Sequence, residues 1–459
     1  MLFIISKSKS LLLINISGEI ESGDMMNRSI FGIAVMTLCV SMAFMPANAL
    51  DFTLQIFGNA NMDDTIDDQD IEYVQEIIDG SKDKTELADA NYDGTIDEKD
   101  IAQIELIVGG KERNLTFIDL YGEAVTINKP IERVASLGIN GPQLLRLIGA
   151  EDKLLPIVGG SKSEEPVFWG EISSYHSVGA SPPDVDYEYI FSHSPDLVQT
   201  NLEMFNSISD SGKAQKKELE KNLPGIPLIH LNAREPSHIS QSILIYGYIF
   251  DREDQAQKFA SWHDEIYKKI KTITDQIPEE NKPTFLFCSH GQIYGYAPSG
   301  NRFGETVRLA GGKNLMDDIV KSDSPLYGQS TIEVEPEWVV KSNPQFMVTN
   351  YGISTNSGFE TDDVSGAKTV VDAILNTTEL ANVDAVKNGN VYFISGRLIG
   401  GGGLNIVAAA FLGKLWHPVE FKDINPKEIL REYLAFYDSN FDVDTQQGVF
   451  IYPPLPDAQ

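Results

Sequence analysis

The chain has little positive charge and almost no cysteine. Its 459 residues include 67 Asp and Glu against 36 Lys and Arg, which gives a formal net charge of −31 at pH 7. Because nucleic-acid binding needs clustered Lys and Arg to neutralise phosphates, we expect no nucleic-acid partner. The two cysteines are Cys39 and Cys288, and Cys39 lies in a segment that we expect to be removed. No disulfide within the mature chain is therefore predicted.

Long apolar runs are absent outside the N-terminal region. Residues 25–49 are typical of a signal peptide, with a basic Arg28, an apolar run over 30–45 and small residues at Ala47 and Ala49. We expect cleavage after Ala49, and residues 1–24 precede a second good start at Met25. The alternative is an uncut segment that anchors the protein in the membrane. Either alternative predicts export, to the outer face of the cell membrane or a periplasm-like space.

Signatures of catalysis are also scarce. Ser289 and His290 are neighbours in sequence, which directs their side chains to opposite sides of a strand rather than toward each other. The sequence contains no glycine-rich phosphate loop ending in Lys and Ser or Thr. We therefore do not expect an enzyme.

An acidic loop occurs twice, at residues 59–70 and 89–100. Both copies carry oxygen side chains at loop positions 1, 3, 5, 9 and 12, and a backbone carbonyl is available at position 7. This is the ligand pattern that calcium requires. After each loop an apolar stripe follows at helical spacing, Ile71, Val74, Ile77 and Ile78 in the first copy and Ile101, Ile104, Ile107 and Val108 in the second.

These loops resemble the paired calcium loops of dockerins, which have Asp rather than Glu at position 12 and one helix after each loop. The resemblance implies calcium as a cofactor, a small all-α module over residues 50–113, and a cohesin-like partner. The alternatives are an acidic helical hairpin without metal and a purely intramolecular role. The first loop departs from the pattern, because Asn59 replaces the leading Asp and Asp64 stands where glycine is usual. The implied ligands are Asp89, Asn91, Asp93, Thr95, Asp97 and Asp100 in the second loop, and Asn59, Asn61, Asp63, Thr65, Asp67 and Asp70 in the first.

Residues 188–201 and 337–350 repeat one pattern, with Glu, Pro and Asn at the same spacing. The pattern predicts a short helix that stops before Pro195 or Pro344 and then a buried strand. A second repeat closes helices with Gly149 and Gly311, where glycine favours a left-handed cap. Two lobes built on one plan are therefore expected.

Strands and helices alternate through the main domain, which predicts parallel sheets with flanking helices. The expected elements begin with strands at 116–120, 124–127, 133–137 and 153–158 and a helix through 144–148. Residues 251–276 contain no glycine or proline and predict one long helix that joins the lobes.

Residues 117–127, 130–137, 177–179, 194–198 and 390–394 resemble the periplasmic binding proteins that deliver ferric siderophores, haem or vitamin B12 to ABC importers. The resemblance covers about residues 115–437. It implies two Rossmann-like α/β lobes bridged by one helix, with the ligand in the cleft between them. The expected organisation is a signal segment at 1–49, the acidic module at 50–113, an N-terminal lobe at 114–250, a linking helix at 251–277, a C-terminal lobe at 278–440 and a tail at 441–459.

Glu188 and Glu337 match, by this resemblance, the glutamates on the two lobes that dock into arginine pockets of the permease. A carboxylate facing an arginine gives charge-assisted pairing that fixes orientation. The alternative is two solvated glutamates, since acidic residues are favoured near helix N-termini anyway. Apart from the permease, only an uncleaved N-terminal segment would bring the chain to a membrane.

The ligand cleft is predicted from the loops that follow the strands. Aromatic rings suit a large, rigid chelate, and arginines suit a carboxylate or a ferric catecholate. The candidates are Trp169, Tyr294, Tyr296, Tyr351, Arg302, Arg397, Asn201 and Asn350, and the alternative for the aromatics and arginines is a structural role. Glycines 400–403 either let the backbone approach a ligand or form a flexible lead-in to a helix.

Capture of a bare metal ion is disfavoured, because such sites need several converging His or carboxylate ligands and the seven histidines are scattered singly. Only His176 and His290 are placed near the cleft. The competing function is a surface-tethered chelate-binding or adhesion protein, held by a dockerin–cohesin type contact and not coupled to transport.

Overall fold

The computed structural model describes residues 4–7, 10–13, 52–159, 165–200, 210–288, 303–321, 324, 326, 332–350 and 357–455. The chain divides into two compact units, Met1–Asn48 and Ala49–Gln459. The first contains an antiparallel pair, β1 (Ile4–Lys7) and β2 (Ser10–Leu13). Among the described residues, no helix combines the length and the apolar character that crossing a bilayer would need.

The acidic module contains two helices of equal length, α2 (Asp68–Ile78) and α3 (Glu98–Val108). Each begins with a capping box, in which Asp67 or Asp97 caps the helix and Asp70 or Asp100 accepts a hydrogen bond back from the cap residue. The predicted apolar stripes are buried at Val74, Ile77, Ile104 and Ile107. Val108 is the last residue of α3 and is exposed.

The N-terminal lobe opens with a hairpin, β3 (Asn114–Ile118) and β4 (Ala124–Asn128). A parallel five-stranded sheet follows, in the order β7-β6-β5-β8-β9. Its strands are β5 (Val134–Ser136), β6 (Leu154–Val158), β7 (His176–Ser177), β8 (Leu197–Gln199) and β9 (Leu228–Ile229). Its helices are α4 (Asn140–Leu147), α5 (Pro166–Trp169), α6 (Tyr187–Ser192), α7 (Asp210–Asn222) and α8 (Ile239–Phe250).

The C-terminal lobe repeats this plan in a sheet of order β11-β10-β12-β13-β14. Its strands are β10 (Thr284–Cys288), β11 (Lys313–Asn314), β12 (Phe346–Thr349), β13 (Val391–Ile394) and the antiparallel β14 (Ile451–Tyr452). Its helices are α10 (Gly304–Leu309), α11 (Met316–Ile319), α12 (Pro336–Ser342), α13 (Ser365–Leu375), α14 (Asp384–Lys387), α15 (Gly396–Ile399), α16 (Asn405–Trp416) and α17 (Pro426–Leu434). Strand β14 comes from the segment expected to be a tail.

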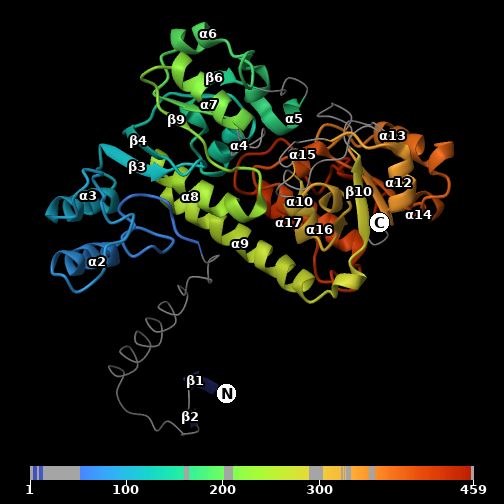
Figure 1. The fold of residues 1–459 in the computed structure, drawn as a ribbon, viewed down its shortest axis with the longest axis horizontal. Helices are drawn as coiled ribbons and strands as arrows, with labels where there is room; N and C mark the ends of the chain where they lie inside the picture. Colours follow the sequence, from blue (N-terminus) through green and yellow to red (C-terminus); the bar gives the residue numbers. More distant parts are fainter. Residues whose placement is uncertain are drawn as a thin grey trace, which may run out of the picture. The chain divides into compact units, whose positions relative to one another are not determined.

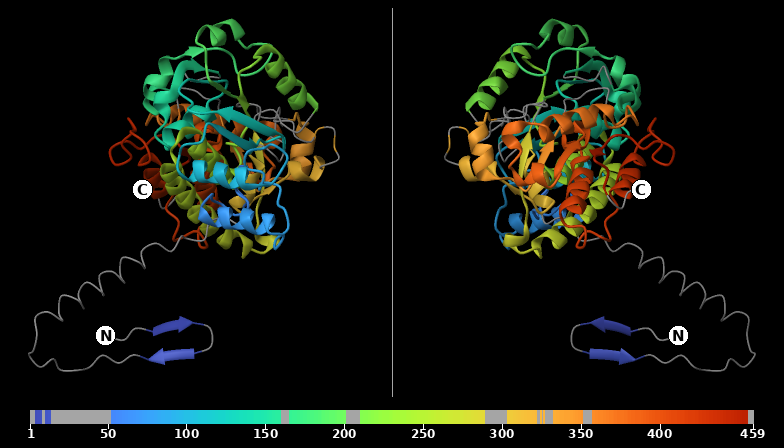
Figure 2. Two further views of the ribbon diagram at one scale, coloured as in Figure 1. Left: turned by 90° about the vertical axis from the view of Figure 1, so that its left-hand side faces the viewer. Right: turned by 90° about the vertical axis from the view of Figure 1, so that its right-hand side faces the viewer.

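One long helix, α9 (Glu253–Asp275), joins the lobes as predicted (Figure 1 and Figure 2). It packs against α4 and α8 of the N-terminal lobe and against α10 and α16 of the C-terminal lobe. The absence of glycine and proline allows 23 uninterrupted helical residues, and the buried Phe259 and Ile270 lie on its packed face.

The repeated pattern is confirmed in both lobes. Helices α6 and α12 end before Pro195 and Pro344, and β8 and β12 follow directly. Gly149 and Gly311 both take a positive φ, +67° and +83°, as the left-handed caps require.

Candidate functional site

The two sheets reverse their strand order at equivalent places. In the N-terminal lobe, β6 and β8 lie on either side of β5, and in the C-terminal lobe β11 and β12 lie on either side of β10. Open α/β sheets bind ligands beyond the carboxyl ends of the strands at such reversal points. The residues that follow β5, β8, β10 and β12 are therefore the first candidates for a binding site.

Five of the predicted ligand residues lie outside the described part of the chain, namely Asn201, Tyr294, Tyr296, Arg302 and Tyr351. The same holds for Ser289 and His290. The described candidates are Trp169, Arg397 and Asn350. Asn350 directly follows β12, and its amide lies 3.7 Å from the point where a Cβ on Gly396 would stand.

Trp169 and Arg397 meet in a buried cluster that joins the lobes. The Arg397 guanidinium pairs with Glu165, which also accepts a hydrogen bond from Trp169 Nε1 (3.3 Å, to Oε2). The guanidinium carbon lies 4.8 Å from the ring centroid of Phe168 and 5.0 Å from that of Trp169. Both candidates are thus engaged with protein groups here, and a direct contact with a ligand would require the lobes to part.

Further contacts between the lobes surround this pair. Glu360 of the C-terminal lobe accepts hydrogen bonds from the backbone amides of Val167 (3.1 Å) and Phe168 (2.9 Å) at the start of α5. Burial raises the pKa of the Glu360 carboxyl, and these two hydrogen bonds act against that rise. Phe359 stacks on Phe168 with ring centroids 4.8 Å apart.

Arg146 supports the cluster from the N-terminal lobe. Its Nη1 donates to the carbonyl of Phe168 (2.7 Å), and its guanidinium carbon lies 4.0 Å from the ring centroid of Tyr437. Burial raises the pKa of Tyr437 to about 12, so its hydroxyl is neutral. Sequence reasoning missed Glu165, Arg146 and Glu360 as site residues, because the partners that define their roles are far away in sequence.

Glycines 401–403, which precede α16, pack against side chains of both lobes. A Cβ on Gly402 would lie 2.3 Å from Gln143 Cδ, so only glycine fits against the N-terminal lobe. The Gly402 carbonyl accepts hydrogen bonds from Gln143 Nε2 (3.1 Å) and Tyr433 OH (2.9 Å).

Glu188 and Glu337 occupy matching positions on the two lobes. Each lies in the first turn of a short helix, α6 or α12, and each is exposed. Neither forms an ion pair with another described residue.

The two acidic loops form nearly the same hydrogen bonds. The amide of Asp63 donates to Asn59 Oδ1 (3.1 Å), as that of Asp93 donates to Asp89 Oδ1 (3.0 Å). The Thr65 and Thr95 amides donate to Asp63 and Asp93, at 2.9 and 3.0 Å.

The loops differ at position 6 and position 1. Gly94 has a φ of +88° and donates to Asp89 Oδ2 (2.8 Å), whereas Asp64 does not take a positive φ. The Asn59 side-chain amide donates to the carbonyls of Leu54 (2.8 Å) and Asp63 (2.7 Å). The second loop therefore has the sharper turn and a carboxylate at the leading position, both of which suit a cation.

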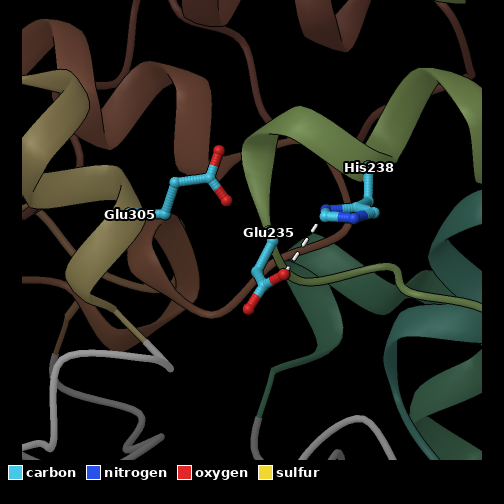
Figure 3. A group of neighbouring side chains, drawn as sticks. All are labelled: Glu235, His238 and Glu305. Atoms are coloured by element: carbon cyan, nitrogen blue, oxygen red, sulfur yellow. Dashed lines mark ion pairs between the residues drawn. The ribbon is translucent and has the colours of Figure 1, made fainter. Parts of the chain in front are cut away.

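A histidine that the sequence did not place near the cleft lies close to two glutamates. Glu235, His238 and Glu305 bring one ligand atom each to within 4.8 Å of one another (Figure 3). Glu305 lies in the first turn of α10, in the C-terminal lobe, and burial raises the pKa of its carboxyl. This convergence could not be predicted from the sequence, because Glu305 is remote in the chain from Glu235 and His238.

Two α/β lobes of one plan, joined by a single long helix, are the architecture of a solute-binding protein. The family model described as periplasmic binding protein matches residues 134–398, more than half of the chain, and the protein belongs to that family. Its members are solute-binding proteins that work with ABC permeases and are typically not enzymes.

Solved structures share this fold at low identity. An ABC transporter solute-binding protein from Sulfurospirillum deleyianum is 15% identical, with 70% of this chain and 94% of that chain covered and a TM-score of 0.56. The TroA-like periplasmic binding protein FepB from Veillonella parvula is 20% identical, with 73% and 98% covered and a TM-score of 0.55. Molybdate-bound MolA from Haemophilus influenzae is 15% identical, with 72% and 98% covered and a TM-score of 0.55. A search of curated proteins finds no match.

Proposed function

We propose that this protein is the exported substrate-binding component of an ABC importer, and that it captures an iron chelate, haem or cobalamin between its lobes. The family membership and the reversal of strand order in each of the two sheets support this proposal. The observation that carries it furthest is the single helix α9, since two lobes on one helix can enclose a large ligand by small rotations.

The chelate class is supported by the groups where the lobes meet. Arg146 and Arg397 lie beside the buried rings of Phe168 and Trp169, so parting of the lobes would offer a ligand positive charge next to a flat apolar surface. Such a surface suits a rigid, anionic chelate or macrocycle. Asn201, Tyr294, Tyr296, Arg302, Tyr351 and Asn350 remain the proposed ligand contacts in the surrounding loops.

The first experiment is a calorimetric titration of the calcium-loaded mature chain with cobalamin, haem and a set of ferric siderophores. We expect one of these ligands to bind with micromolar or tighter affinity. Binding of none of them would contradict the delivery function.

Permease docking through Glu188 and Glu337 is the second part of the proposal. The double variant Glu188→Ala/Glu337→Ala should bind ligand normally and lose at least about tenfold of ligand-stimulated transport in a reconstituted importer, since each lobe would lose a charge-assisted contact. The matched control is Glu218→Ala/Glu333→Ala, which removes one exposed glutamate from each lobe elsewhere. Unchanged transport in the docking variant would contradict this assignment.

The acidic module supports a second candidate, a chelate-binding protein tethered to a scaffold by a cohesin-like domain. Three large apolar side chains of the second repeat are exposed, Tyr92, Leu106 and Val108. Exposed apolar groups on one small module favour a protein partner. We propose calcium as the cofactor of its loops, through the ligands named above.

A further inference from the structure

The three converging side chains come from two lobes. Glu235 directly precedes the short 3₁₀ helix η4 (Pro236–His238), and His238 is the last residue of η4, which leads into α8 of the N-terminal lobe. Glu305 belongs to α10 of the C-terminal lobe. A ligand held by all three would therefore connect the lobes beside the linking helix (Figure 3).

Both carboxylates are already held in place by neighbours. Asn232 Nδ2 donates to Glu235 Oε2 (2.8 Å). The Ser237 amide donates to Glu305 Oε1 (2.9 Å), and Tyr267 OH of α9 donates to the same oxygen (3.5 Å). The carboxylates thus need little further ordering to bind an ion.

The negative charge of the Glu235 and Glu305 carboxylates is not neutralised by a Lys or Arg of the described residues. His238 Nδ1 lies 3.4 Å from Glu235 Oε2, which is the only ion pair that either glutamate forms within the described residues. No Lys or Arg of the described ranges pairs with Glu235 or Glu305. Two half-buried carboxylates close to each other leave a negative charge that a divalent cation would neutralise.

We propose that Glu235, His238 and Glu305 bind one divalent transition-metal ion, of the zinc or nickel type, directly between the two lobes. One imidazole nitrogen with two carboxylate oxygens is a donor set that suits zinc and nickel better than calcium or magnesium. Two donors at about 2.0–2.1 Å from a tetrahedral zinc ion lie about 3.3 Å apart, close to the 3.4 Å between His238 Nδ1 and Glu235 Oε2. Three protein ligands leave a fourth position open.

The site is independent of the proposed chelate cargo, since the bare ion is bound by side chains alone. Its test is a calorimetric titration of the full chain with Zn²⁺, after chelator treatment and in saturating Ca²⁺ so that the acidic loops are filled. We expect one Zn²⁺ per chain at micromolar or tighter affinity, with a rise in melting temperature, because the ion would join the two lobes.

His238→Ala should weaken Zn²⁺ binding by at least about tenfold, since even changes outside the ligand shell cost that much in metal sites. His238 is exposed, so this variant should fold normally. Glu305→Gln tests the opposite lobe and should weaken binding to the same degree. The matched control, His176→Ala, removes an exposed imidazole from β7 and should leave the affinity unchanged. No binding tighter than about 100 µM, or equal affinity in His238→Ala and the unmodified chain, would overturn the proposal.

Discussion

Lys129 shows how one buried charge connects three parts of the protein. Its side-chain exposure is 3%, and its ammonium pairs with the buried Glu112 of the acidic module. It also donates to Asp251 Oδ1 (2.6 Å) and to the carbonyl of Tyr248 (2.6 Å) at the end of α8. The module, β4 and α8 therefore meet at one nitrogen atom.

Lys129→Ala should destabilise the protein by about 3–5 kcal/mol, because it leaves the Glu112 carboxylate buried without a counter-charge. Urea unfolding in saturating calcium measures the effect. The control is Lys153→Ala, which removes a surface pair with Glu132 and should cost less than about 1 kcal/mol. Equal losses in the two variants would show that the buried pair has no special role.

For single residues, the sequence predicted the positions of exposed side chains better than it predicted which buried side chains pair with each other. Glu188 and Glu337 could be placed on short helices, because proline and the apolar pattern fix those helices locally. The roles of Glu112, Glu165 and Glu305 could not be predicted, since each depends on a partner that lies nearby only in the folded chain. Glu165 and Arg397 are 232 residues apart.

Helices and strands were predicted well where the sequence pattern that determines them is local. Residues 251–276 were expected as one helix, and α9 spans Glu253–Asp275. Strand β14 was missed, because its two residues have no periodic pattern of their own and pair with β13 only in the folded lobe. The paired acidic loops could be recognised in the sequence, because the spacing of the proposed ligands lies within twelve residues.

The two loops should differ in their affinity for calcium. Asp93 and Asp63 occupy the same loop position, but only the second loop has both the glycine turn and a leading Asp. Asp93→Ala should weaken the tighter calcium site by more than about tenfold, whereas Asp63→Ala should leave that site unchanged.

Calorimetric titration of each variant with Ca²⁺ measures the difference. Asp68→Ala is the control, because Asp68 is exposed and stands outside the proposed ligand set. If Asp63→Ala alone removed the tighter site, the proposed ranking of the loops would be wrong.

At the scale of the whole molecule, the Glu165–Arg397 pair holds the lobes in contact. Arg397→Ala should lower the stability by about 3–5 kcal/mol, since Glu165 would stay buried without its partner. It should also increase the radius of gyration in solution, because the lobes would lose a contact that opposes their separation.

Urea unfolding and small-angle X-ray scattering measure these two effects. Arg431→Ala is the control, since it removes surface pairs with Glu428 and Asp444 within the C-terminal lobe. An unchanged radius of gyration together with unchanged stability would mean that this pair does not hold the lobes together.

The acidic module continues into the N-terminal lobe without a free linker. Ile56 bridges to Phe117 of β3, and the amides of Phe57 and Ile118 form backbone hydrogen bonds across this junction. Tyr248 OH accepts a hydrogen bond from the amide of Ile66 (3.0 Å), which ties the first loop to α8. A partner bound to the module would therefore be rigidly coupled to the N-terminal lobe, and it would fix the orientation of that lobe relative to the surface that carries the partner.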